Sequence, residues 1–96
     1  MPAYIIAMVN VKDAEKYQEY AKRAGPAGAK YGGKFRVRGG AKTPLEGEIP
    51  FQRIVVNEFP SVEAAKKFYS SPEYQEARKF RLGAADFNMV IVEGAD

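Results

Sequence analysis

The chain of 96 residues contains no cysteine, no histidine and no tryptophan. Without cysteine it can form neither a disulfide nor a thiolate metal site, and without histidine the usual zinc sites are excluded as well. Histidine is also the side chain best suited to proton transfer near neutral pH, so serine–histidine–aspartate and cysteine–histidine nucleophilic catalysis are excluded. A histidine-ligated haem is excluded on the same ground.

Long hydrophobic runs are also missing. No stretch of the sequence approaches the roughly 18 consecutive apolar residues that a membrane helix requires. The first residues, Met1-Pro2-Ala3-Tyr4, lack the basic segment and the small-residue cleavage site of a signal peptide. We therefore expect a cytoplasmic protein without a membrane partner.

Charge of one sign is not strongly in excess, because 15 lysines and arginines oppose 12 acidic residues and leave a net charge of +3. Part of the positive charge clusters between Lys30 and Lys42. A nucleic-acid interface requires a basic stripe with interleaved aromatic residues, or a recognisable recognition helix. Phe35 alone among these charges is weak support for such a stripe, and we expect no nucleic-acid partner.

Signals for a metal or a nucleotide are equally weak. The acidic residues best placed to bind a metal are Asp13, Glu46, Glu48 and Glu58. Their spacing matches no EF-hand. The run from Gly28 to Lys34 matches Gly-x-x-x-x-Gly-Lys, but Phe35 follows where a phosphate-binding loop has the serine or threonine that reaches magnesium. A helix also leads into a strand here, which inverts the required context. We expect neither a metal nor a cofactor.

Apolar runs and alternation predict strands over residues 4–9, from 35 to the glycines at 39 and 40, over 51–59 and over 87–93. Asp13, Ser61 and Ser71 are placed as helix N-caps. Gly25-Pro26 should interrupt the first helix, and a short second piece should end at Gly32-Gly33 in the left-handed conformation. Residues 42–50 form the one clear loop, rich in turn formers and charge.

The order strand, helix, strand, strand, helix, strand predicts one α+β domain over residues 1–96, of the ferredoxin-like kind. Its four-stranded antiparallel sheet would carry the helices on one face. The first, third and fourth strands are apolar on both faces, so the other face would expose a large apolar patch. A domain this small buries only roughly 60–65% of its unfolded surface and gains stability from assembly. We therefore predict a homodimer in which a second copy covers the bare face.

Four sequence segments occur in an order that resembles the short bacterial family catalogued as domain of unknown function 1330. They are residues 31–40, residues 56–61, Ser71-Pro72-Glu73-Tyr74 and Val92-Glu93-Gly94. The resemblance spans essentially the whole chain. It implies a dimeric α/β barrel, in which two ferredoxin-like subunits pack sheet to sheet and each has a cleft between its helices and its sheet.

The resemblance carries four functional candidates onto this chain. Arg38 stands before the paired glycines, Glu58 before Phe-Pro, Tyr74 within Ser-Pro-Glu-Tyr, and Arg81 one to two turns later. The family usually has an aspartate where this chain has Asn10. Arginine presents a permanently charged planar fork suited to carboxylate, so Arg38 and Arg81 could clamp an anionic ligand. The alternative is that Arg38 pairs with Glu58 on the neighbouring strand, and Arg81 with a surface acid.

Tyrosines at helical spacing form a second set of candidates. Tyr17, Tyr20, Tyr69 and Tyr74 could line the cleft and donate phenolic hydrogen bonds, although such residues are more often part of an amphipathic core. Glu58 could act as a general base if the cleft raised its pKa, with an ion pair as the alternative. The ligand-binding candidates are therefore Asn10, Tyr17, Arg38, Glu58, Tyr74 and Arg81.

Two classes of function follow from these observations. The first is a small-molecule binder or enzyme that uses the cleft for an anionic or aromatic compound. Such an enzyme would be metal-independent, of the cofactor-independent monooxygenase or isomerase type found on this barrel. The second is a non-catalytic dimeric sensor or assembly module. The sequence leaves open whether any reaction is catalysed, and which.

Overall fold

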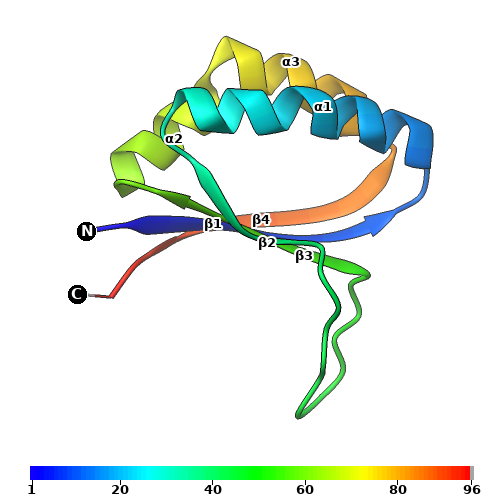
Figure 1. Ribbon diagram of the computed structural model, residues 1–96. Coiled ribbons are helices and arrows are strands. Elements are labelled where there is room, and N and C mark those ends of the chain that lie inside the picture. Colours follow the sequence, from blue (N-terminus) through cyan, green and yellow to red (C-terminus); the bar gives the residue numbers. More distant parts are fainter. Residues whose placement is uncertain (96) are drawn as a thin grey trace.

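A computed structural model describes residues 1–95 and contains four strands and three helices. In chain order they are β1 (Ala3–Val11), α1 (Ala14–Lys30), β2 (Lys34–Arg38), β3 (Arg53–Phe59), α2 (Val62–Ser70), α3 (Pro72–Arg81) and β4 (Ala85–Glu93). Figure 1 shows the helices gathered on one face of the sheet, with α1 and α3 side by side. Within residues 1–95, no helix combines the length and hydropathy that crossing a bilayer requires.

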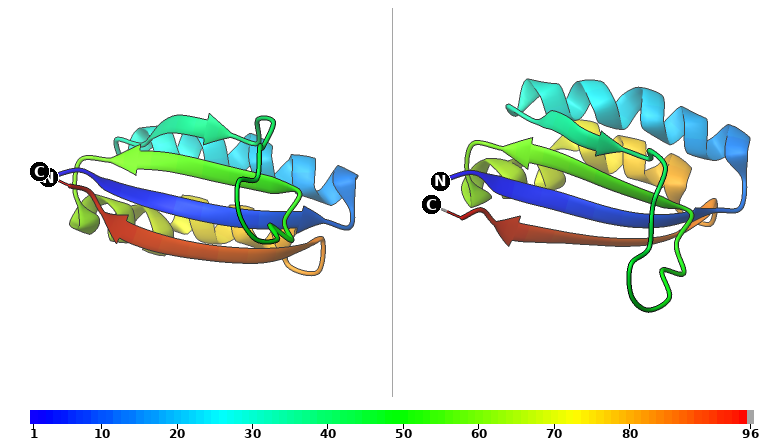
Figure 2. Two further views of the ribbon diagram at one scale, coloured as in Figure 1. Left: turned by 90° about the horizontal axis from the view of Figure 1, so that it is seen from below. Right: turned by 60° about the horizontal axis from the view of Figure 1, so that its bottom comes forward.

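The strands form one antiparallel sheet in the order β2-β3-β1-β4. The two central strands, β1 and β3, pair from Ala3 opposite Phe59 to Val9 opposite Arg53. This arrangement confirms the predicted ferredoxin-like fold. The other face of the sheet carries no helix, as the view from below in Figure 2 shows.

The helices begin at the residues that the sequence predicts. Asp13 Oδ1 accepts a hydrogen bond from the Lys16 backbone N–H at 3.2 Å, and the Ser61 hydroxyl accepts one from Ala64 at 3.1 Å. Ser71 caps α3 in the same way, with Pro72 at its first position. Each cap satisfies one of the N–H groups that a helix start leaves without a partner.

The predicted break at Gly25-Pro26 is wrong, because α1 continues through Pro26 to Lys30. Within a helix, proline removes one backbone hydrogen bond, and its ring crowds the preceding turn and the Cβ of the residue before it. Gly25 has no Cβ and removes part of that crowding. Beyond the proline, Ala27 and Gly28 are buried, so packing of the helix offsets the missing hydrogen bond.

The two glycines after α1 serve different purposes. Gly32 has a φ of 89°, the left-handed conformation that glycine adopts without steric cost. Gly33 does not have a positive φ, contrary to expectation, but a Cβ on it would lie 2.8 Å from Phe59 Cζ and 2.9 Å from the Gly28 carbonyl oxygen. Gly33 therefore allows the chain to turn closely against the core.

Strand β2 departs from simple alternation. Phe35 lies opposite Asn57 and Val37 opposite Val56, so Arg36 forms a β-bulge. The extra residue turns Phe35 and Arg38 to the same, helix-covered side, although they are three positions apart. Val37 faces the other side. The sequence pattern, in which Phe35 and Val37 alternate with basic residues, predicts both on one side, and this prediction is wrong because of the bulge.

The central strands present small or apolar residues to the helices. Ala3, Ile5, Ala7 and Val9 of β1 are buried, whereas the residues between them are only half-buried. The strand is thus buried on one side within a single chain, not on both. The core beneath the helices consists of Ile5, Tyr20, Ala27, Phe59, Ala65, Phe68, Tyr74 and Ala77.

The uncovered side, called here the bare face, is aliphatic. Register and burial place on it Tyr4, Ile6, Met8, Val37, Ile54, Val56, Val90 and Val92. Val37, Val90 and Val92 are 42%, 47% and 43% exposed. The connection between β2 and β3 projects from the sheet on this side (Figures 1 and 2). It spans residues 39–52 and is longer than the predicted loop of 42–50.

Candidate functional site

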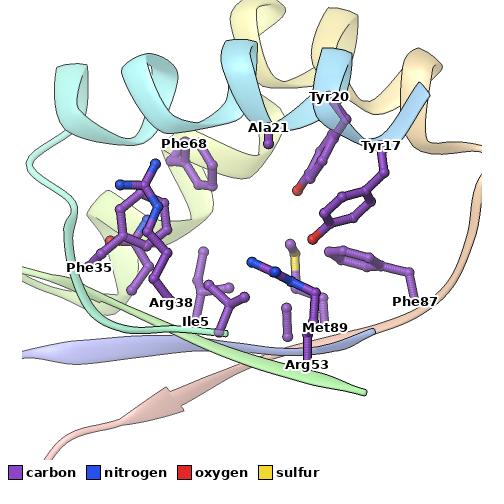
Figure 3. Close-up of a pocket in the computed structure, with 13 residues that line it drawn as sticks. Ile5, Tyr17, Tyr20, Ala21, Phe35, Arg38, Arg53, Phe68, Phe87 and Met89 are labelled. Atoms are coloured by element: carbon purple, nitrogen blue, oxygen red, sulfur yellow. The ribbon is translucent and has the colours of Figure 1, made fainter. Parts of the chain in front are cut away.

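The site with the most convincing chemistry is a cavity between α1 and the sheet, near β2 and β3 (Figure 3). Its volume is about 80 Å³. One water needs roughly 10–15 Å³ by this measure, so the cavity has room for several waters or a small organic molecule. Helix α1 contributes Tyr17, Tyr20 and Ala21, and the remaining walls are Ile5, Ala7, Phe35, Arg38, Arg53, Val55, Asn57, Phe68, Phe87 and Met89.

Two arginines reach the cavity from neighbouring strands. Arg38 does so because of the bulge at Arg36, and Arg53 because the first residue of β3 shares the helix-covered side with Val55. Figure 3 shows the Arg53 side chain directed upward from the sheet, toward Tyr17.

Glycines make room for both guanidinium groups. A Cβ on Gly39 would lie 2.6 Å from Arg53 Cζ, and a Cβ on Gly25 would lie 3.3 Å from Arg38 Nη2. Gly39 also has a φ of 72°. The end of β2 and the C-terminal half of α1 therefore fit closely around the two charged groups.

Neither guanidinium has an acidic partner among the residues that the structure describes. Among residues 1–95, every ion pair involves other basic residues, and none involves Arg38 or Arg53. Arg38 instead lies 4.1 Å from the centre of the Phe35 ring, and Arg53 lies 5.8 Å from that of Tyr17. Such cation–π contacts orient a guanidinium without neutralising its charge. Arg53 is half-buried and Arg38 is exposed at the rim, so the cavity carries two uncompensated positive charges.

Phenol groups supply the neutral polar atoms of the site. The Tyr20 and Tyr74 hydroxyls lie 3.0 Å apart, and Arg81 Nη2 donates to the Tyr74 oxygen at 3.3 Å. Burial raises the pKa of Tyr20 well above its usual value. Burial also raises the pKa of Tyr17, although the neighbouring Arg53 opposes the shift. Both phenols therefore stay protonated at neutral pH and can donate hydrogen bonds.

Only two of the six predicted ligand-binding residues, Tyr17 and Arg38, line this cavity. Tyr74 is fully buried behind Tyr20. Arg81 is 8% exposed, with its guanidinium 3.9 Å from the centre of the Phe87 ring, and it borders a separate hollow beside β4. The structure therefore does not bring Arg38 and Arg81 together as a clamp.

The other two candidates lie on the bare face. Glu58 accepts a hydrogen bond from Arg36 Nε at 2.9 Å, so its partner is the arginine of the bulge and not Arg38. Asn10 binds the 39–52 loop, with its Nδ2 donating to the Pro50 carbonyl and its Oδ1 accepting from the Gln52 N–H, both at 2.8 Å. The thickness of the sheet separates both residues from the cavity.

Sequence reasoning missed Arg53. A signal for it existed, because Arg53, Val55, Asn57 and Phe59 follow the two-residue period of one face of a strand. The buried aromatic Phe59 therefore places Arg53 on the helix-covered side.

Among the described residues, no three acidic side chains gather as metal ligands would. The polar groups that line the cavity are guanidinium, phenol and amide groups, and no carboxylate is among them. The site can attract an anion and donate hydrogen bonds to it, but it offers no carboxylate base.

Comparison with known proteins places the chain in a family. The family model for the domain of unknown function DUF1330 matches residues 2–95. The chain belongs to this family. The predicted resemblance is thereby confirmed. No curated protein matches the chain.

Solved structures share the fold over the whole chain. A protein of unknown function from Rhodopseudomonas palustris has 26% sequence identity and a TM-score of 0.79, covering 99% of this chain and 83% of that one. A dimeric ferredoxin-like protein of unknown function from a Jannaschia species has 14% identity and a TM-score of 0.76, covering 98% and 100%. SnoaB, a cofactor-independent oxygenase from Streptomyces nogalater, has 11% identity and a TM-score of 0.65, covering 99% and 94%.

Proposed function

We propose that this protein is a homodimer that binds a small organic anion with an aromatic or apolar body in the cavity beneath α1. The observation that carries this proposal is the pair of guanidinium groups, Arg38 and Arg53, which face an aromatic-lined cavity without an acidic partner within residues 1–95. Arg53 is half-buried and its Nε has no hydrogen-bond partner among the described residues, whereas Arg38 is exposed at the rim. Partial burial of an unpaired charge is costly, and an anionic ligand supplies the partner that Arg53 lacks. We assign ligand contact to Arg38, Arg53 and Tyr17.

The lining suits the rest of such a ligand. Ligand pockets are typically apolar with a few convergent polar groups that fix orientation. Here Phe35, Phe68 and Phe87 provide flat apolar surfaces, and the two arginines provide forks that match a carboxylate. A single-ring carboxylate such as benzoate is therefore a suitable probe.

Turnover at this site would have to rely on the substrate's own reactivity. If the protein is an enzyme, we place it with metal-independent and cofactor-independent monooxygenases or isomerases, in which the pocket binds and activates the substrate. The fold is shared with one cofactor-independent oxygenase. In that case the arginines would stabilise a developing oxyanion, and the phenols of Tyr17 and Tyr20 would donate hydrogen bonds.

A non-catalytic sensor or assembly module is the second candidate. The titratable side chains that line the cavity favour it. They are the two arginines, and Tyr17 and Tyr20, whose raised pKa values keep both phenols protonated, so none of them can accept a proton at neutral pH. A general base must be able to accept a proton at the operating pH. The two candidates share the anion site and differ in whether the bound molecule is released unchanged.

The homodimer rests on the bare face. An apolar sheet face that includes Ile6, Val56 and Val90 is a patch of the kind that monomeric proteins rarely expose. Packing a second sheet on it would bury that surface at the usual separation of about 10 Å between sheets. A second copy of the chain is the partner that we propose.

Calorimetric titration with benzoate tests the anion site. We expect saturable binding to the wild type, and a loss of affinity of about tenfold or more in Arg53→Gln and in Arg38→Gln, since each removes a charge-assisted contact. Arg23→Gln is the matched control, because Arg23 pairs with Glu19, lies over the Phe80 ring of α3 and does not line the cavity. This change should leave benzoate affinity unaltered. Benzamide, which has the same ring without the charge, should not bind. Equal binding of benzamide, or full affinity in both variants, would refute the proposal.

A further inference from the structure

The connection between β2 and β3 is unusual for a domain of this size. It runs over residues 39–52 without regular structure, and loops longer than roughly 12–15 residues are uncommon and usually functional. Its residues 41–50 are all exposed. Leu45 is 91% exposed and Ile49 is 42% exposed, so two aliphatic side chains stand at the surface of a segment that is otherwise polar.

This loop has a defined direction. Figures 1 and 2 show that it leaves the sheet on the bare side, away from the helices. Asn10, at the end of β1, hydrogen-bonds to Pro50 and Gln52 at 2.8 Å. The Gln52 side chain accepts from the Val11 N–H at 3.1 Å, and Lys42 Nζ donates to the Gln52 carbonyl at 2.5 Å. These bonds fix both ends of the loop against the edge of the bare face.

Together the loop and the sheet enclose a groove. It is lined by Lys42, Thr43, Pro44, Leu45, Glu46, Ile49 and Ile54. Ile54 belongs to the bare face and the other residues to the loop, so the groove continues directly into the bare face. Leu45 is 91% exposed, and no other part of residues 1–95 covers it.

We propose that residues 41–51 form an arm that holds a second copy of this chain, with Leu45 packed on the bare face of that copy. The proposal rests on the homodimer proposed above. In a two-fold interface the same surface serves both subunits, so a projecting side chain and the apolar surface that receives it must lie on one side of the molecule. Leu45 and the bare face meet this requirement.

Charge complementarity also favours a second copy as the occupant. The tip of the arm, Glu46-Gly47-Glu48, carries two exposed carboxylates without an ion pair among residues 1–95. Lys34 is an exposed cation on β2, on the bare face, and it has no ion pair among residues 1–95. Arg36 on the same strand is also exposed, although it already pairs with Glu58. A second copy therefore offers basic side chains to the acidic tip of the arm, and an acidic partner to Lys34.

The test is the dimer dissociation constant, measured by sedimentation velocity over a dilution series. We expect a wild-type dimer, and a dissociation constant at least tenfold higher in Leu45→Asp and higher still in Leu45→Asp with Ile49→Asp. Both residues are exposed in the single chain, so folding should be unaffected, which circular dichroism checks. Leu82→Asp is the matched control, because Leu82 is 50% exposed at the end of α3 and should leave the constant unchanged.

The outcomes separate the arm from the dimer. If the wild type is a dimer and the double variant dissociates no more readily than Leu82→Asp, the arm is refuted and the dimer stands. If the wild type is a monomer at every concentration, both the arm and the proposed homodimer are refuted.

Discussion

The two faces of the sheet are built from the same strands, yet they differ in their aromatic content and in whether their arginines have acidic partners. The helix-covered face carries most of the aromatic side chains of the sheet, and Arg38 and Arg53 lie on it without acidic partners in the described part of the chain. The bare face is mainly aliphatic, and there Arg36 pairs with Glu58. Unpaired guanidinium groups beneath a helix favour the binding of an anion on the covered face. An aliphatic surface whose arginine is already paired favours packing against a second sheet.

The largest expected effect on assembly comes from placing a charge at the centre of the bare face. Ile6→Glu would put an unpaired carboxylate between two packed sheets, which is strongly unfavourable. We expect the dimer dissociation constant to rise by about 100-fold or more, as measured by sedimentation over a dilution series. Benzoate binding should persist, because the cavity lies on the other face. An unchanged dimer would show that the bare face is not the interface.

The second effect probes the covered face. Phe59 is 1% exposed and stacks on Phe68 with ring centres 5.2 Å apart. We expect Phe59→Ala to lower the free energy of unfolding by about 3–5 kcal/mol, measured in urea. Tyr4→Phe, on the bare face, serves as the control and should cost little. A loss below 1 kcal/mol in Phe59→Ala would contradict a core located under the helices.

A third, opposite effect is expected at the cavity itself. Arg53→Met removes a half-buried charge that has no acidic partner while keeping much of the side-chain volume. We expect the ligand-free protein to become more stable by about 0.5–1 kcal/mol in thermal unfolding, while benzoate affinity falls. A substantial loss of stability would instead assign Arg53 a structural role.

The smallest expected effect lies outside both faces, where Lys30 of α1 pairs with Glu73 of α3. The hydrogen bond from Lys30 lowers the pKa of Glu73, so the pair stabilises the folded state above the carboxyl's unfolded pKa. That contribution is lost as the pH falls through the lower, folded pKa. Glu73→Gln should therefore unfold at a slightly lower temperature at neutral pH, and this difference should vanish in acid. A difference that persists at low pH would contradict the ion-pair account.

Much of the fold follows from local signals in the sequence. The caps at Asp13, Ser61 and Ser71 depend on their immediate neighbours and lie where the pattern predicts. The four strands lie within a few residues of their predicted ranges, and β3 begins two residues later than predicted. The continuity of α1 through Pro26 does not follow, because it depends on the small Gly25 and on packing farther along the helix. The alternation of side chains also gives no sign of the bulge at Arg36. The bulge adds one residue to β2, and this extra residue reverses which of the following side chains face the helices.

The candidate site depends on these less visible features. The sequence identifies Arg38 and Tyr17, but the bulge decides that Arg38 faces α1 and that Glu58 meets Arg36. Asn10 is a polar residue at the end of a strand, which predicts neither its face nor its bonds to the loop. Such placements depend on contacts between residues 22 to 42 positions apart in the sequence, which single-sequence patterns do not contain.

Native mass spectrometry of the chain with added benzoate, beside Arg53→Gln, tests the central claim most directly. We predict twice the chain mass for both proteins, with one benzoate per chain on the wild type and little or none on the variant. A single-chain mass would contradict assembly through the bare face. Equal benzoate occupancy in both proteins would contradict an anion site beneath α1.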